Sequence, residues 1–109
     1  MSGGGRELIV DARYAAGLLR AELYVRHRIE ADLNAGQGMA VVSVWAGLVV
    51  WSNGRWFWWS VGRISSRRRL LYTICPASDV PTAARWVARR YAVLRREQTR
   101  AQYVQAWPQ

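Results

Sequence analysis

Two apolar runs joined by the tripeptide Ser52-Asn53-Gly54 constrain the fold of this chain more than any other feature. AVVSVWAGLVVW precedes the tripeptide and RWFWWSVG follows it. β-Branched and aromatic residues favour strands, and Asn-Gly between two such runs is the strongest short-range hairpin signal. The pattern predicts an antiparallel hairpin, with Met39–Trp51 as one long strand and residues 55–62 as its partner.

Further strands are predicted on both sides of this hairpin. The basic turn ISSRRR leads into a third strong strand, LLYTIC, which ends at Pro76 because proline has no N–H to donate to a ladder. Upstream, the alternation of Ile29, Ala31 and Leu33 indicates a short edge strand, and residues 34–38 are predicted to form a loop. The sheet should therefore contain three to four strands.

The N-terminal part of the chain has the periodicity of a helix from Arg6 to Arg26. Arg13 and Arg20 fall on the side opposite the apolar residues, and Gly17 is a weak point that costs about 1 kcal/mol relative to Ala. The apolar stripe consists of Leu8, Ala12, Ala15, Leu19 and Leu23.

A second helix is predicted near the C-terminus. Ser78 or Asp79 can cap it, and Pro81 suits its first turn. We expect the helix to fray beyond Gln98. Its apolar stripe consists of Val80, Ala84, Val87, Tyr91 and Leu94.

Consecutive strands between two terminal helices indicate an α+β fold. We predict an N-terminal helix, an antiparallel β-meander of three to four strands, and a C-terminal helix packed on one sheet face. The length of 109 residues allows one core. The expected organisation is a flexible leader at 1–5, a single domain at 6–98 and a loosely ordered tail at 99–109.

Tryptophan is concentrated in the predicted sheet, whose side chains alternate between two faces. The row Ala40, Val42, Val44, Ala46, Leu48 and Val50 is uniformly apolar and is predicted to lie under the helices. The other row carries Trp45 and Trp51, and the register leaves open which residues of the partner strand join them. The candidate interaction face consists of Trp45, Trp51, Trp56, Trp58 and Trp59.

Three functions fit such a face: a homodimer interface, a docking surface for another protein, or a stacking platform for unpaired bases. In the platform, Arg55, Arg63 and Arg67–Arg69 would hold the nucleic-acid backbone. Alternatively, helices and tail bury the strand on both sides. For a short chain, burial or a dimer is favoured over the stacking platform.

The charge distribution is lopsided, with sixteen arginines, no lysine and seven acidic residues giving a net charge of +9. Such a field favours polyanions, acidic proteins or anionic membrane surfaces as partners, although it also keeps a protein in solution. Three-residue charge runs and the polar side of an amphipathic helix are usually only solvated. The candidate phosphate contacts are Arg67, Arg68, Arg69, Arg85, Arg89, Arg96 and Arg100.

Catalytic and metal-binding residues are sparse. His27 is the only histidine, Cys75 is a lone cysteine in an apolar stretch, and neither has a local catalytic motif. Glu30 and Asp32 would share a strand face without a histidine to complete a metal site. We therefore expect no enzymatic activity, no cofactor and no metal.

Neither a membrane span nor a secretion signal is predicted. The longest apolar run, Met39–Trp51, is too short for a bilayer and is interrupted by Ser43 and Gly47. The N-terminal residues lack the basic and apolar regions of a signal peptide. A cytoplasmic protein is the expectation.

The run VVSVWAGLVVWSNGRWFWWSVGR, followed by a strand, a Pro-containing turn and AARWVARRYAVLRR, resembles small uncharacterised proteins of Streptomyces-type actinomycetes. The resemblance covers roughly residues 15–97. It implies an accessory or regulatory role, with no activity, cofactor or catalytic residue.

Together these features predict a non-enzymatic interaction module that is homodimeric and engages a protein partner or regulatory complex. It would use the Trp-bearing sheet face and the Arg-rich surface. The alternative is a nucleic-acid-binding protein that contacts phosphates through its arginine clusters. The two functions differ in salt dependence, because only nucleic-acid binding weakens steeply as salt rises.

Overall fold

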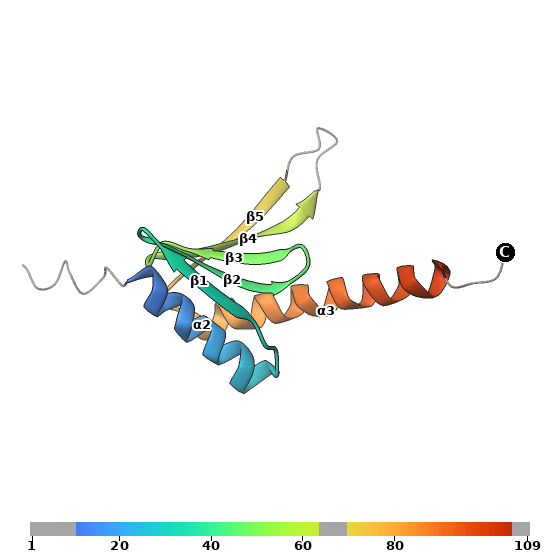
Figure 1. The fold of residues 1–109 in the computed structure, drawn as a ribbon, viewed down its shortest axis with the longest axis horizontal. Coiled ribbons are helices and arrows are strands. Elements are labelled where there is room, and N and C mark those ends of the chain that lie inside the picture. The colour runs from blue at the N-terminus through green and yellow to red at the C-terminus, as the bar shows by residue number, and fades with distance from the viewer. Residues whose placement is uncertain (1–10, 64–69, 106–109) are drawn as a thin grey trace, which may run out of the picture.

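The computed structural model describes residues 11–63 and 70–105, which form two helices and five strands. The described part has the predicted α+β class, with helices at its two ends and strands between them (Figure 1). In chain order the elements are α2 (Ala12–His27), β1 (Asp32–Gly36), β2 (Met39–Trp45), β3 (Leu48–Ser52), β4 (Trp56–Arg63), β5 (Leu70–Pro76) and α3 (Val80–Gln105).

The strands form one antiparallel meander in the order β1-β2-β3-β4-β5. The prediction of three to four strands was too low, because Met39–Trp51 is not a single strand. The chain reverses at Ala46 and Gly47, where Gly47 has a φ of 81° that glycine adopts at little cost. Ala46 is consequently exposed in a turn instead of buried in the predicted apolar row.

Both helices cover the same face of the sheet (Figure 1). The other residues of the predicted apolar row, from β2 and β3, are buried beneath them. Phe57 and Trp59 of β4 and Leu19 and Leu23 of α2 are the largest fully buried side chains of the core. The predicted stripe of α3 is confirmed for Ala84 and Val87 at the centre, with Val80, Tyr91 and Leu94 partly buried around them.

The hairpin turn predicted at Ser52-Asn53-Gly54 joins β3 to β4. The Asn53 Oδ1 accepts hydrogen bonds from the N–H groups of Arg55 and Trp56, each at 2.9 Å. Gly54 has a φ of 92°, and its N–H donates to the buried Ser52 Oγ at 3.2 Å. This turn fixes the register of β3 against β4.

The predicted edge strand at Ile29, Ala31 and Leu33 begins later than expected, because β1 starts at Asp32; Ile29 and Ala31 precede it and are buried in the core. The predicted loop at 34–38 was too long. The strand continues to Gly36, and only Gln37 and Gly38 form the turn, both with positive φ.

The helix boundaries partly match the expectations. Residues 6–10 of the predicted first helix, and the leader at 1–5, lie outside the described residues. At the start of α3 the Asp79 Oδ1 accepts a hydrogen bond from the Thr82 N–H at 3.3 Å, so Asp79 is the cap. The helix continues past Gln98 to Gln105 and runs beyond the sheet (Figure 1).

Candidate functional site

The sheet face turned away from α2 and α3, here called the open face, is covered by neither helix (Figure 1). Large apolar side chains on it are strongly exposed. The exposed fractions are 41% for Trp51, 45% for Trp56, 53% for Tyr72 and 59% for Ile74. The two helices therefore do not bury the sheet on both sides.

A continuous row of paired residues crosses the open face. Val41 of β2 pairs with Trp51 of β3, Trp51 with Trp58 of β4, and Trp58 with Ile74 of β5. Directly opposite side chains in antiparallel strands lie about 4.5–5.5 Å apart at Cβ. The row therefore forms one contiguous apolar strip over four strands.

The size of the open face suits a binding surface. Five strands spaced about 4.8 Å apart, with paired segments of about 20 Å, give a planar footprint of about 400 Å². The row Val41, Trp51, Trp58 and Ile74 occupies part of this footprint, and contiguous exposed apolar patches on monomers are often functional.

The open face carries few charged groups among the side chains that the structure describes. In residues 11–62 and 71–76, Asp32 at the β1 edge is charged and no side chain on this face is cationic, while the side chain of Arg63 at the end of β4 is outside the described ones. Arg55 lies in the β3–β4 turn, outside the strands. A stacking platform for bases needs cations beside the aromatic rings to hold the phosphate backbone. The described side chains of the open face supply no such cation, and Arg63 and Arg67–Arg69 are outside the described side chains, so the stacking platform stays a prediction.

Trp45 does not belong to the open face, contrary to the prediction. Its ring lies edge-on to Tyr91 of α3, with centroids 5.6 Å apart, and the Arg95 guanidinium sits 4.9 Å from the Trp45 centroid. The cause is a register shift between Ser43 and Trp45. A bulge inserts one residue and so reverses the face on which the next side chain points.

Trp59 is likewise excluded from the open face. It is 1% exposed and packs in the core on the helix-covered side with Phe57, while Trp56 and Trp58 point to the open face. The predicted split of the four residues into two faces is thus confirmed. Tyr72 and Ile74 were missed, although the alternation within LLYTIC pairs them on one face.

The predicted arginines of α3 are all exposed: Arg85, Arg89, Arg96 and Arg100. In the described part of the chain, Arg26 and Glu22 form the only ion pair, at 3.8 Å. Arg67, Arg68 and Arg69 lie outside the described residues. The structure thus keeps the two candidate surfaces apart, with the aromatic residues on the sheet and the described arginine stripe on α3.

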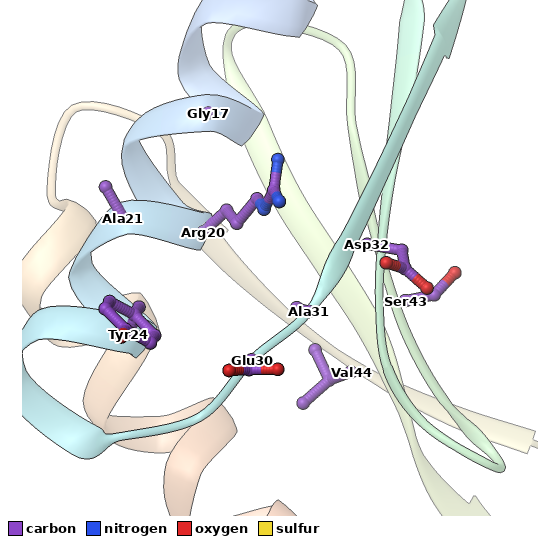
Figure 2. Close-up of a pocket in the computed structure, with 9 residues that line it drawn as sticks. All are labelled: Gly17, Arg20, Ala21, Tyr24, Glu30, Ala31, Asp32, Ser43 and Val44. Carbon is purple, nitrogen blue, oxygen red and sulfur yellow. The ribbon is translucent and has the colours of Figure 1, made fainter.

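A hollow of about 760 Å³ lies between α2 and the start of β1. Arg20 reaches from α2 toward β1, whereas Asp32 and Ser43 lie on the other side of that strand (Figure 2). Neither a histidine nor a cysteine lines this hollow. Its charged groups do not converge on one point, so the hollow assembles no acid–base or nucleophilic set.

The lone thiol is part of the core. Cys75 is buried, and its Sγ donates to the Asp79 carbonyl oxygen at 3.8 Å. Burial, reinforced by the charge of Asp79, raises the pKa of the Cys75 thiol. A buried thiol with a raised pKa is a poor nucleophile. Within residues 11–63 and 70–105, no three metal-ligating side chains gather.

Comparisons with protein-family models, curated proteins and solved structures find no match for this chain. The resemblance to small actinomycete proteins stays a prediction. No helix in the described residues is long and apolar enough to span a bilayer. The open face and the exposed arginines of α3 are therefore the two candidate functional surfaces among the described residues.

Proposed function

We propose that this protein is a non-enzymatic protein-interaction module that forms a homodimer by stacking two open faces. The observation that carries the proposal is the row Val41, Trp51, Trp58 and Ile74, in which Trp51 on β3 and Ile74 on β5 are strongly exposed. Stacking two such rows removes large aromatic and aliphatic surfaces from water.

The charge distribution favours a second copy of this chain as the partner that covers the open face. Two molecules that each carry a net charge of +9 repel one another wherever their arginines meet. The side chains described on the open face, in residues 11–62 and 71–76, include no cation, so two copies can meet through this part of the face without bringing arginines together. Homodimer interfaces are also more apolar than other surfaces, and the isologous contact uses one patch twice.

The footprint sets the expected strength of the dimer. Two planar faces of about 400 Å² each give a combined area below about 1,200 Å², the total buried area that separates standard-sized interfaces from weak ones. We therefore expect a dimer that dissociates on dilution. The proposed setting is the cytoplasm, where the open face of the monomer would also accept an apolar surface of a protein partner or regulatory complex.

Sedimentation equilibrium over a range of protein concentrations tests the proposal, with Ile74→Arg as the variant. Ile74 is 59% exposed, so the change leaves the core intact but places a cation in the face of each copy. The expected result is a concentration-dependent dimer for the wild type, undiminished by salt, and a monomer for I74R. Salt should not weaken the dimer, because apolar contacts stabilise it and because salt screens the repulsion between the two positively charged copies.

Trp86→Gln provides the matched control, since Trp86 is an aromatic of similar exposure, 37%, that lies on α3. The W86Q variant should dimerise like the wild type. A wild type that remains monomeric at all concentrations, or a dimer that I74R does not disturb, contradicts self-association through the open face.

A further inference from the structure

The outer face of α3 presents four arginines in a single stripe. Arg85, Arg89, Arg96 and Arg100 follow one another at steps of four, seven and four residues. At about 100° per residue these steps keep all four within about 60° of one another around the helix. The stripe lies opposite Ala84 and Val87, which are buried in the core.

This stripe is long and accessible. The rise of about 1.5 Å per residue places Arg85 and Arg100 about 22 Å apart along the helix axis. All four side chains are exposed, and the C-terminal part of α3 runs beyond the sheet (Figure 1). An extended partner can therefore lie along the helix without meeting the body of the domain.

The remaining arginines of α3 have other contacts. Arg95 donates to the Tyr91 Oη at 2.8 Å and lies over the Trp45 ring. Arg90 is half-buried, with its Nη2 near the backbone of Gly62. Glu97 is the one acidic residue in the sequence of α3, and no ion pair joins it to the stripe among the described side chains.

We propose that the outer face of α3 binds the phosphodiester backbone of a nucleic acid through Arg85, Arg89, Arg96 and Arg100. The partner is matched by charge, because a linear array of cations without carboxylate partners complements a linear array of phosphates. This binding is independent of the proposed homodimer and uses a different surface.

The side chains around the stripe favour nucleic acid over a membrane surface. A helix that lies in a membrane interface needs large apolar side chains beside its cations. The exposed neighbours of the stripe are instead the small side chains Ala92 and Thr99 and a single large apolar one, Trp86. Trp86 is the one large exposed apolar side chain among the described side chains of α3.

Counterion release predicts how steeply the binding should weaken as salt rises. Each neutralised phosphate contributes about 0.9 to the slope of log K against log salt for a duplex, and about 0.7 for a single strand. Four contacts therefore contribute about 3.6 to the duplex slope and about 2.8 to the single-strand slope. A fourfold rise in salt should weaken duplex binding about 100-fold or more.

Fluorescence anisotropy with a labelled mixed-sequence oligonucleotide, as a duplex and as a single strand, tests the proposal over a salt series. For the variant R85Q/R89Q/R96Q/R100Q, the slope of log K against log salt with the duplex should be smaller by about 3–4 than for the wild type. The variant should also lose most of its affinity at low salt. Glutamine is a good helix former, and all four positions are exposed, so the variant should unfold at the same urea concentration as the wild type.

The control R13Q/R20Q/R26Q/R28Q removes the same charge from exposed positions on α2 and directly after it. It should keep the wild-type slope, because a local stripe and not the total charge makes the contacts. The I74R variant, which is monomeric under the proposed function, should also keep the wild-type slope of log K against log salt. Oligonucleotide binding can thus be tested separately from the homodimer.

Three results overturn the proposal. One is the absence of salt-sensitive binding to either oligonucleotide. Another is an equal loss of slope in the α2 and α3 variants, which would assign binding to net charge alone. The third is binding to phosphatidylserine vesicles without binding to the oligonucleotides, which would assign the stripe to a membrane surface.

Discussion

Trp51 of β3 lies directly opposite Trp58 of β4, and both side chains point to the open face. The pair joins the two halves of the apolar row, because Val41 pairs with Trp51 and Ile74 with Trp58. This cross-strand pair thus occupies the middle of the surface proposed for a second copy.

A double-mutant cycle on Trp51 and Trp58 should detect the contact inside one molecule. Cross-strand aromatic pairs contribute about 0.2–1 kcal/mol, so we expect a coupling energy of that size between Trp51→Thr and Trp58→Thr. Urea unfolding in the I74R background, which is monomeric under the proposal, provides the measurement. Additive effects would show that the two indoles do not support each other.

The contact of Arg95 with Trp45 and Tyr91 should stabilise the junction of α3 with the β2–β3 turn. At an exposed site a cation–π contact contributes about 0.5–1 kcal/mol, so Arg95→Gln should lower the free energy of unfolding by about that amount. Arg96→Gln, the adjacent exposed position, is the control and should have little effect. Equal stability of R95Q and R96Q would rule out this role.

The outcome for Trp45 shows which structural detail could be inferred from sequence. Alternation correctly separated Trp56 and Trp58 from Phe57 and Trp59, because that rule holds along an uninterrupted strand. It failed for Trp45, since the bulge next to it changes the face without leaving a clear local signal. Gly47 did mark a break in the apolar run, but the stronger Asn-Gly turn downstream suggested one long strand.

The fold class was accessible to prediction for a different reason. Helical periodicity and β-branched runs are local, so the order of elements follows from short segments. That neither α2 nor α3 covers the open face is a tertiary property, because α2 could equally have packed on the other side of the sheet. The same applies to Tyr72 and Ile74, whose exposure depends on where both helices pack.

Asn53 should be the most sensitive exposed position of the β3–β4 turn. Its side chain accepts two backbone hydrogen bonds, so Asn53→Ala should cost about 1 kcal/mol or more of unfolding free energy. Asn53→Asp keeps the accepting oxygen and should retain most of the stability. Thermal unfolding of both variants provides the comparison, and equal losses would contradict the role of the oxygen.

Cys75 should make stability fall at alkaline pH. Because the pKa of its thiol is raised in the folded protein, the folded state holds the proton at pH values where the unfolded state has released it. The contribution to stability is therefore complete below the ordinary pKa and is lost as pH rises through the raised value. Urea unfolding across this range should show a smaller decline for Cys75→Ala. Parallel curves would contradict the shift.

The two proposed surfaces are compatible in one assembly. Both helices lie on the face of the sheet opposite the open face (Figure 1). Stacking two open faces therefore leaves each α3 on the outside of the dimer, with its arginine stripe accessible. The dimer should bind oligonucleotides with the same salt dependence per protomer as the I74R monomer, which titrations at matched protomer concentrations would measure.

Hydroxyl-radical footprinting as a function of protein concentration tests the central proposal most directly. Trp51, Trp56 and Trp86 have similar exposures, so their oxidation rates can be compared within one sample. If two open faces stack, Trp51 and Trp56 become protected as concentration rises, while Trp86 on α3 keeps its rate. Unchanged oxidation of Trp51 and Trp56 at all concentrations, or protection of Trp86 instead, would contradict a dimer formed through the open face.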